Sequence, residues 1–228
     1  MTPGSLNEFK VTLLSAGPIW YNEAYAARVC RMTSPLKKGD RKMTQEKLDN
    51  WQEKTIHTEP IFQGKIISLQ VDTIELPDGK TATREIVRHP GAAAVLALHE
   101  DRMLVVEQYR KPMEKFQVEI PAGKLDPGED PIVCAGRELE EETGYRAASL
   151  RPISAFYTSP GFADEKLYLY LAEGLEKGAM NLDEDEYLRV EAITLEEALR
   201  YIEEGRISDA KTVLAVYAWR LYKLTGEV

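Results

Sequence analysis

The sequence has little cysteine, little histidine and no long apolar run, and each scarcity excludes a class of protein. Its two cysteines, Cys30 and Cys134, are too few for a disulfide framework and are typical of a reducing compartment. The three histidines, His57, His89 and His99, lack the spacing of a metal site. No apolar run approaches the roughly 18 residues that a membrane-spanning helix needs. We therefore expect a cytoplasmic protein that does not bind membranes.

Positive charge is also in deficit. The chain has 29 Lys and Arg against 38 Asp and Glu, a net charge of −9. This balance disfavours a general nucleic-acid-binding surface. A negative protein can still bind a negative substrate if metal ions lie between them.

The N-terminal segment differs from the rest in charge and pattern. The first 42 residues have a net charge of +4, which leaves −13 for the remainder. They show neither strict alternation nor a sustained helical period, and they lack the basic start of a signal peptide. We expect residues 1–47 to be an extension that is disordered or absent from the native folded protein, which would naturally begin near Met43. Residues 48–228 would then form one catalytic domain.

The central and C-terminal parts predict mixed secondary structure. Alternation over 65–76 and 80–89, around the turn at 77–79, predicts an antiparallel hairpin subdomain at 56–89, followed by a core at 90–228. Further strands are expected at 92–98, 102–110, about 148–157, about 165–173 and 188–193, and helices at 131–143, 195–205 and 209–224. The run at 92–98 is apolar throughout, so this strand should be buried on both faces. The expected class is α+β, with a mixed sheet between helices.

One of these helices has an unusual density of acid. Asp130 and Pro131 predict its start and Gly144 its end. Between them lie four glutamates, Glu138, Glu140, Glu141 and Glu142, with Arg137 beside them. Like charges four residues apart destabilise a helix by about 0.2–0.5 kcal/mol per pair.

The spacing of the glutamates offers a reason for this density. Glu138, Glu141 and Glu142 lie on one helical face, close to a glycine-containing loop that has free carbonyls. Such an oxygen-rich site suits Mg²⁺ or Mn²⁺. Arg137 can also hold Glu141, four residues later. The alternative is a solvated acidic face, but such a face usually has Lys or Arg four residues after Glu, and Glu138 has Glu142 there.

The stretch from Gly123 to Tyr145 resembles the Nudix box, G-x5-E-x7-R-E-U-x-E-E-x-G-U, where U is a bulky apolar residue. The matching residues are Gly123, Glu129, Arg137, Glu138, Leu139, Glu141, Glu142 and Gly144. Tyr145 departs from the usual aliphatic residue and should pack similarly. The resemblance implies the Nudix fold and hydrolysis of a nucleoside diphosphate linked to another moiety.

Similarity to the ADP-ribose pyrophosphatase branch extends over about residues 48–225. Pro160 lies sixteen positions after Gly144, a spacing associated with that branch, and "VEQYRKP", "EIPAG", "GFADE" and "LEEALRYIEEGRISDAKT" also resemble it. The implied reaction splits ADP-ribose into AMP and ribose 5-phosphate. Pyrophosphatases for GDP-mannose or ADP-glucose, and a non-catalytic ADP-ribose sensor, are the alternatives. The sensor would be expected to have lost part of the glutamate set, which is intact.

The resemblance also implies roles for single residues. Metal ligands would be Glu138 and Glu142, with Glu141 alongside and the Ala122 carbonyl from the backbone. Glu129 would orient Arg137 or serve as a secondary ligand. Residues implied to contact substrate are Arg110 at the diphosphate, Arg84 and Glu85 at the nucleoside, Glu119 at metal or ribose, and Pro160 in its loop.

A general base is still needed, and the loop "DEDEY" supplies carboxylates for it. Alignment of the following strand with the family favours Glu184 first and Glu186 second. The loop could equally be a solvated acidic segment. The family further implies a homodimer in which the hairpin subdomain reaches the partner's site, in agreement with a hairpin too small to own a core.

Overall fold

The computed structural model describes residues 51–182 and 187–226, so the predicted extension at 1–47 lies outside the described residues. The strands are β1 (Lys54–Gln63), β2 (Ser68–Glu75), β3 (Thr81–Arg88), β4 (Ala92–His99), β5 (Arg102–Arg110), β6 (Lys115–Glu119), β7 (Ala122–Lys124), β8 (Tyr145–Tyr157), β9 (Lys166–Lys177) and β10 (Leu188–Ile193). The helices are η1 (Lys111–Met113, a short 3₁₀ turn), α3 (Pro131–Thr143), α4 (Leu195–Glu203) and α5 (Ala210–Thr225). None of the helices in this part of the chain combines the length and apolarity that crossing a bilayer demands.

The N-terminal sheet contains the predicted hairpin and one further strand. β2 and β3 pair in antiparallel register across the predicted turn, and β1 pairs with the other edge of β2. The Thr58 hydroxyl donates to Asp72 at 2.8 Å and helps join β1 to β2. All ten residues of β1 are exposed, so β1 lacks the alternation between core and solvent that reveals a strand in a sequence.

The larger sheet has seven strands and mixed direction. Its main order is β10-β5-β4-β9-β8, and β6 and β7 pair with β5 and β4. β4 and β9 are parallel, whereas the other pairs are antiparallel. β6 and β7 lie where the sequence predicted only the end of a strand and a loop, and β8 begins directly after α3, three residues earlier than expected.

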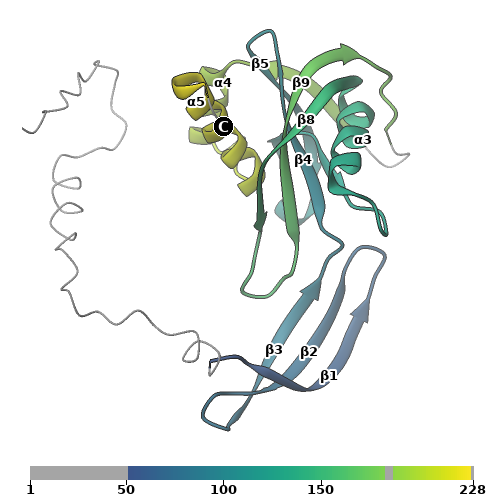
Figure 1. Cartoon of the computed structure of the whole chain (residues 1–228), viewed down its shortest axis with the longest axis vertical. Coiled ribbons are helices and arrows are strands. Elements are labelled where there is room, and N and C mark those ends of the chain that lie inside the picture. The colour runs from purple at the N-terminus through teal and green to yellow at the C-terminus, as the bar shows by residue number, and fades with distance from the viewer. Residues whose placement is uncertain (1–50, 183–186, 227–228) are drawn as a thin grey trace, which may run out of the picture. The chain divides into compact units, whose positions relative to one another are not determined.

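Helices cover both faces of this sheet, as Figure 1 shows: α3 lies on one side, and α4 and α5 lie on the other. Alternate side chains of β4 divide between the two cores. Ala94 and Leu96 pack in the cluster that includes Trp219 of α5. Ala93 and Val95 pack with α3. The prediction of a strand buried on both faces within an α+β fold is confirmed.

The predicted helix boundaries are also confirmed. Asp130 accepts a hydrogen bond from the Ile132 N–H at the start of α3, and Gly144 ends the helix with φ of 70°. Thr194 and Glu197 form the expected capping box of α4. Tyr145 packs against the α3 side of the core, as expected for an apolar position.

The N-terminal sheet is joined to the loop between β8 and β9. The Val87 N–H donates to the Phe162 carbonyl at 2.8 Å, and the His89 N–H donates to Asp164 at 2.8 Å. Arg88 forms an ion pair with the same carboxylate at 3.0 Å. These contacts hold the loop that contains Pro160 beside the end of β3.

Candidate active site

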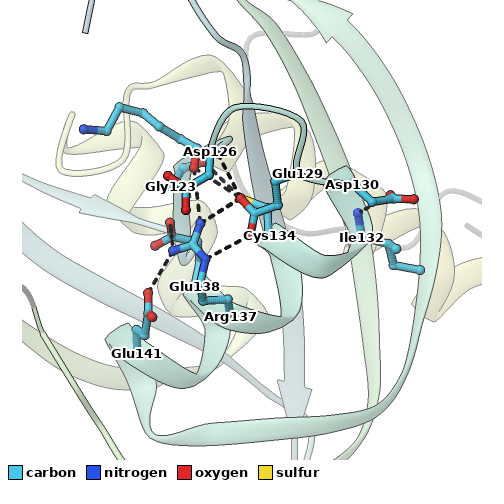
Figure 2. Close-up of polar contacts among 10 residues, drawn as sticks. Gly123, Asp126, Glu129, Asp130, Ile132, Cys134, Arg137, Glu138 and Glu141 are labelled. Atoms are coloured by element: carbon cyan, nitrogen blue, oxygen red, sulfur yellow. Dashed lines mark hydrogen bonds and ion pairs between the residues drawn. The ribbon is translucent and has the colours of Figure 1, made fainter. Parts of the chain in front are cut away.

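Arg137 gathers the glutamates of the predicted motif (Figure 2). Its Nη1 donates to Glu138 at 2.7 Å and to Glu141 at 2.9 Å, and its Nε donates to Glu129 at 3.0 Å. We call these four residues the Arg137 cluster. The contacts expected between Arg137 and Glu129 and between Arg137 and Glu141 are therefore present, the second through one hydrogen bond. One guanidinium therefore offsets part of the repulsion among three carboxylates, which leaves the cluster with surplus negative charge.

The charges in this cluster shift one another's pKa values. Hydrogen bonds from Arg137 lower the pKa of Glu129 from 4.5 to about 2. The same hydrogen bonds, donated by Arg137 to Glu129, and then the negative charge of Glu138 raise the pKa of Arg137. Glu129 and Arg137 are thus both ionised at neutral pH. The neighbouring Cys134 is a free, buried thiol, and burial raises its pKa to about 12.

The loop before α3 fits closely around two of the glutamates. A Cβ atom added at Gly123 would overlap the carboxylate of Glu138, so any other residue at this position would displace that carboxylate. The Ala122 N–H donates to Glu142 at 3.0 Å. Glu142 is only 2% exposed. β7 therefore supplies the backbone against which both carboxylates lie.

The donor set suits a divalent cation in its chemistry, because carboxylates and backbone oxygens are the ligands such ions prefer. The described ranges contain no three His, Cys, Asp or Glu residues grouped to hold an ion together. In this arrangement Glu138 and Glu141 accept hydrogen bonds from Arg137 instead. Glu142 and Ala122 line the adjacent cavity, whose other wall contains Arg110.

This cavity has a volume of about 620 Å³, within the range of small-molecule sites. Residues from seven segments meet there: Ile66; His89 and Ala92; Gln108 and Arg110; Ala122, Gly123 and Lys124; Glu142; Thr158, Ser159, Glu165 and Leu167; and Asp209, Ala210 and Lys211. Three of the predicted site residues, Arg110, Ala122 and Glu142, are thus brought together. Pro160 is exposed, but its neighbour Ser159 lines the cavity.

A second group of charges lies at the cavity wall. Nε and Nη2 of Arg110 donate to the two carboxylate oxygens of Glu119 at 2.6 and 2.7 Å. Lys211 also forms an ion pair with Glu119, and its Nζ lies 3.0 Å from Asp209. We call these four residues the Arg110 cluster. Burial opposes the ionisation of Glu119, but the ion pairs outweigh it and lower the pKa of its carboxyl group.

Other predicted residues lie elsewhere. Arg84 and Glu85 are on β3 and do not line the cavity. Arg84 forms an ion pair with Glu53. Glu184 and Glu186 lie outside the described residues. The sequence reasoning missed His89, Asp209 and Lys211 at the cavity. Lys211 lies in "ISDAKT", a stretch that resembles the ADP-ribose pyrophosphatase branch, but the resemblance implied no role for this lysine.

Comparison with known proteins agrees with this geometry. The NUDIX domain profile matches residues 87–215, and the profile of the nucleoside diphosphate sugar hydrolase N-terminal domain matches residues 53–87. A methanol dehydrogenase activator from Bacillus methanolicus is 59% identical over 169 residues, covering 73% of this chain and 91% of the relative. An ADP-ribose pyrophosphatase from Bacillus subtilis (strain 168) is 55% identical over 168 residues, covering 72% and 91%.

A solved structure has the same fold. The crystal structure of an ADP compounds hydrolase aligns with a TM-score of 0.69 and 21% identity, covering 78% of this chain and 97% of the other. With the intact motif on α3, the matched profiles lead to one conclusion: this chain belongs to the Nudix family and is a Nudix pyrophosphohydrolase.

Proposed function

We propose that this protein hydrolyses ADP-ribose to AMP and ribose 5-phosphate. The observation that carries the proposal is the cavity that Glu142, Ala122 and Arg110 line together. Such a cavity offers a metal side and a guanidinium side to one diphosphate. The 55% identity to an ADP-ribose pyrophosphatase supports the choice of substrate.

Nudix hydrolases generally use a divalent metal ion. We infer Mg²⁺ here, with Mn²⁺ as a substitute, held by Glu138, Glu141, Glu142 and the Ala122 carbonyl. The metal supplies charge that stabilises the oxygens of the diphosphate as water attacks phosphorus. Arg137 orients the carboxylates on its side of the helix.

The remaining roles follow the family resemblance. Arg110 binds the diphosphate. For Glu119 the resemblance implies contact with metal or ribose, whereas its two hydrogen bonds from Arg110 support a role in holding that arginine. Glu184 is our first choice for the base that takes a proton from the attacking water, and Glu186 is the second. An E184Q enzyme should keep its metal affinity and lose most of its turnover, whereas unchanged kcat would remove Glu184 from the mechanism.

We also infer a cytoplasmic homodimer. The location follows from the cysteine usage, which suits a reducing compartment. For the dimer, the exposed β1 carries Ile56, Ile61 and Phe62, each more than half exposed, a surface that suits a second copy of the chain. Arg84 and Glu85 would then reach the nucleoside in the partner's site. Sedimentation of the wild type and of an I61K/F62K variant tests this, and a monomeric wild type contradicts it.

The substrate is tested by a panel of nucleoside diphosphate sugars in which released monophosphates are measured after phosphatase treatment. ADP-ribose should give the highest kcat/KM. A preference for GDP-mannose or ADP-glucose would overturn the substrate while leaving the chemistry intact. Absence of any hydrolysis, together with tight ADP-ribose binding, would favour the sensor.

A second candidate function comes from the relative described as a methanol dehydrogenase activator, which is 59% identical. This chain could likewise activate an alcohol dehydrogenase. Adding it to such an enzyme and measuring dehydrogenase turnover tests the idea. If an E142Q variant, without hydrolase activity, activates equally well, the two functions are separate.

A further inference from the structure

The start of helix α5 reaches the cavity through Lys211, to which the proposed function assigns no role. The ammonium group of Lys211 donates to the Glu119 carboxylate and, at 3.0 Å, to Oδ1 of Asp209. Its side chain is only 12% exposed. A lysine this buried between two carboxylates is confined in position, because leaving either carboxylate unpaired is costly.

Glu119 connects this lysine to Arg110. The fork of two hydrogen bonds from Arg110 to Glu119 sets the plane of the guanidinium. Arginine has five N–H donors, so three remain for a ligand in the cavity. Because Glu119 is 2% exposed and shared by both cations, a change at Lys211 reaches Arg110 through a single carboxylate.

The charges of the Arg110 cluster balance. Arg110 and Lys211 are positive, and Glu119 and Asp209 are negative. Without Lys211 the cluster would have a surplus negative charge at the wall of a cavity that receives an anionic diphosphate. At such short range and low dielectric this repulsion is large compared with that on an exposed surface.

The backbone around Lys211 is held from two sides. Asp209 accepts a hydrogen bond from the Thr212 N–H at 3.0 Å and so caps α5. The Thr212 hydroxyl accepts one from the Ile120 N–H at 3.1 Å, between β6 and β7. Thr212 is fully buried. The first turn of α5 is therefore anchored beside Glu119.

We propose that Lys211 is a positioning residue for the substrate's diphosphate: it pairs with Glu119 so that Arg110 is held in its orientation without a surplus negative charge at the cavity. The inference rests on the proposed function, in which Arg110 contacts the diphosphate. It assigns to the C-terminal helix a part in substrate binding that the Nudix motif does not contain.

The test compares kinetic constants on ADP-ribose. K211M should raise KM about 10- to 100-fold, the loss expected for a charged hydrogen bond. Because Arg110 contacts ground and transition states alike, kcat should change by less than about threefold. K211R should recover most of the affinity. K223M is the matched control, since Lys223 lies on the same helix and pairs with Asp101 away from the cavity, and its KM should equal that of the wild type.

A double variant separates positioning from direct contact. If Lys211 acts through Glu119, removing the Glu119 charge as well should bring the KM of E119Q/K211M back to that of E119Q alone. Additive losses would mean that Lys211 itself touches the substrate, and they would overturn the proposal. If K211M does not fold, the KM of E119Q/K211M can still be compared with that of E119Q, because the double variant leaves no unpaired carboxylate at position 119. Equal KM values support the positioning role.

The proposed function can fail separately. If the wild type does not hydrolyse ADP-ribose, calorimetry compares the same variants for binding of ADP in the presence of Mg²⁺. ADP carries the diphosphate of ADP-ribose without the second ribose. Weaker binding by K211M than by K223M supports the positioning role. Equal binding by K211M, K223M and the wild type overturns it.

Discussion

The Arg137 cluster and the Arg110 cluster each have an arginine at their centre, but they differ in net charge. Arg137 pairs with three carboxylates, whereas Arg110 shares its one carboxylate with a lysine. The first therefore keeps a surplus of negative charge that a cation can satisfy, and the second is balanced. Arg110, Lys211 and Asp209 line the cavity, and Glu142, on the same helix as Arg137, also lines it. The difference in charge fits the proposal that the glutamates of α3 hold a metal ion and that Arg110 binds an anion, although both clusters are rich in acid.

The largest effect should come from removing a carboxylate beside the metal wall. In E142Q we expect kcat on ADP-ribose to fall about 10³-fold, the scale of losing charge stabilisation in a transition state. The matched control is E140Q, on the same helix, because Glu140 pairs with Arg146 outside the cavity. Its activity should equal that of the wild type. Equal losses in the two variants would mean that helix stability, not metal binding, governs activity.

Next in size is the loss of the guanidinium. R137M should lower the free energy of unfolding by about 2–4 kcal/mol, somewhat below the cost of breaking a fully buried pair. Added Mg²⁺ should restore part of this stability, because the ion can neutralise the freed carboxylates. R110M should gain less, since its cluster is left with one surplus negative charge, whereas R137M leaves three carboxylates without their arginine. Thermal unfolding with and without Mg²⁺ measures both, and equal gains would erase the distinction between the clusters.

A smaller effect is expected where the loop meets the Arg137 cluster. G123A places a methyl group onto the Glu138 carboxylate, which must move away from Arg137. We expect a loss of about 1–3 kcal/mol in denaturant unfolding, typical of overpacking. G161A is the control, because a Cβ there meets open space. If both variants are equally stable, the position of the Glu138 carboxylate over Gly123 does not contribute to the stability of the fold.

The smallest effect is a pH dependence. The folded-state pKa of Glu129 is about 2 against 4.5, so its ionisation stabilises the fold above about pH 4.5. This contribution is lost as pH falls towards 2. E129Q should therefore be less stable than the wild type at pH 7, and the gap should shrink between pH 5 and pH 2. Urea midpoints over this range measure the gap, and a constant gap contradicts the assigned ion pair.

Much of the Arg137 cluster could be predicted from the sequence because it is local. Asp130, Gly144 and helical periodicity place the glutamates on one face, and four-residue spacing brings Arg137 to Glu141. The resemblance added Glu129 as the residue that orients Arg137. Short separation in sequence leaves few alternative geometries for such contacts.

The Arg110 cluster could be predicted only in part, because its members come from three distant segments. Lys211 lies in the first turn of a helix, where a lysine is usually solvated, but here its side chain is only 12% exposed beside Glu119, and a hydrogen bond joins the same turn to Ile120. β1 was missed for a different reason. All residues of β1 are exposed in the single chain, so its sequence has no alternation of apolar and polar residues that would predict a strand.

The hydrogen bond between Thr212 and Ile120 has a consequence for biosynthesis. A ribosome makes the motif helix long before it makes α5, and domains fold as their sequence emerges. The proposed positioning of Arg110 needs Lys211, which is translated after the whole motif helix. A nascent chain that ends between α3 and α5 would therefore have the glutamates of the Nudix motif but lack the ion pair between Lys211 and Glu119, so we expect the proposed substrate site to be complete only after α5 has been made.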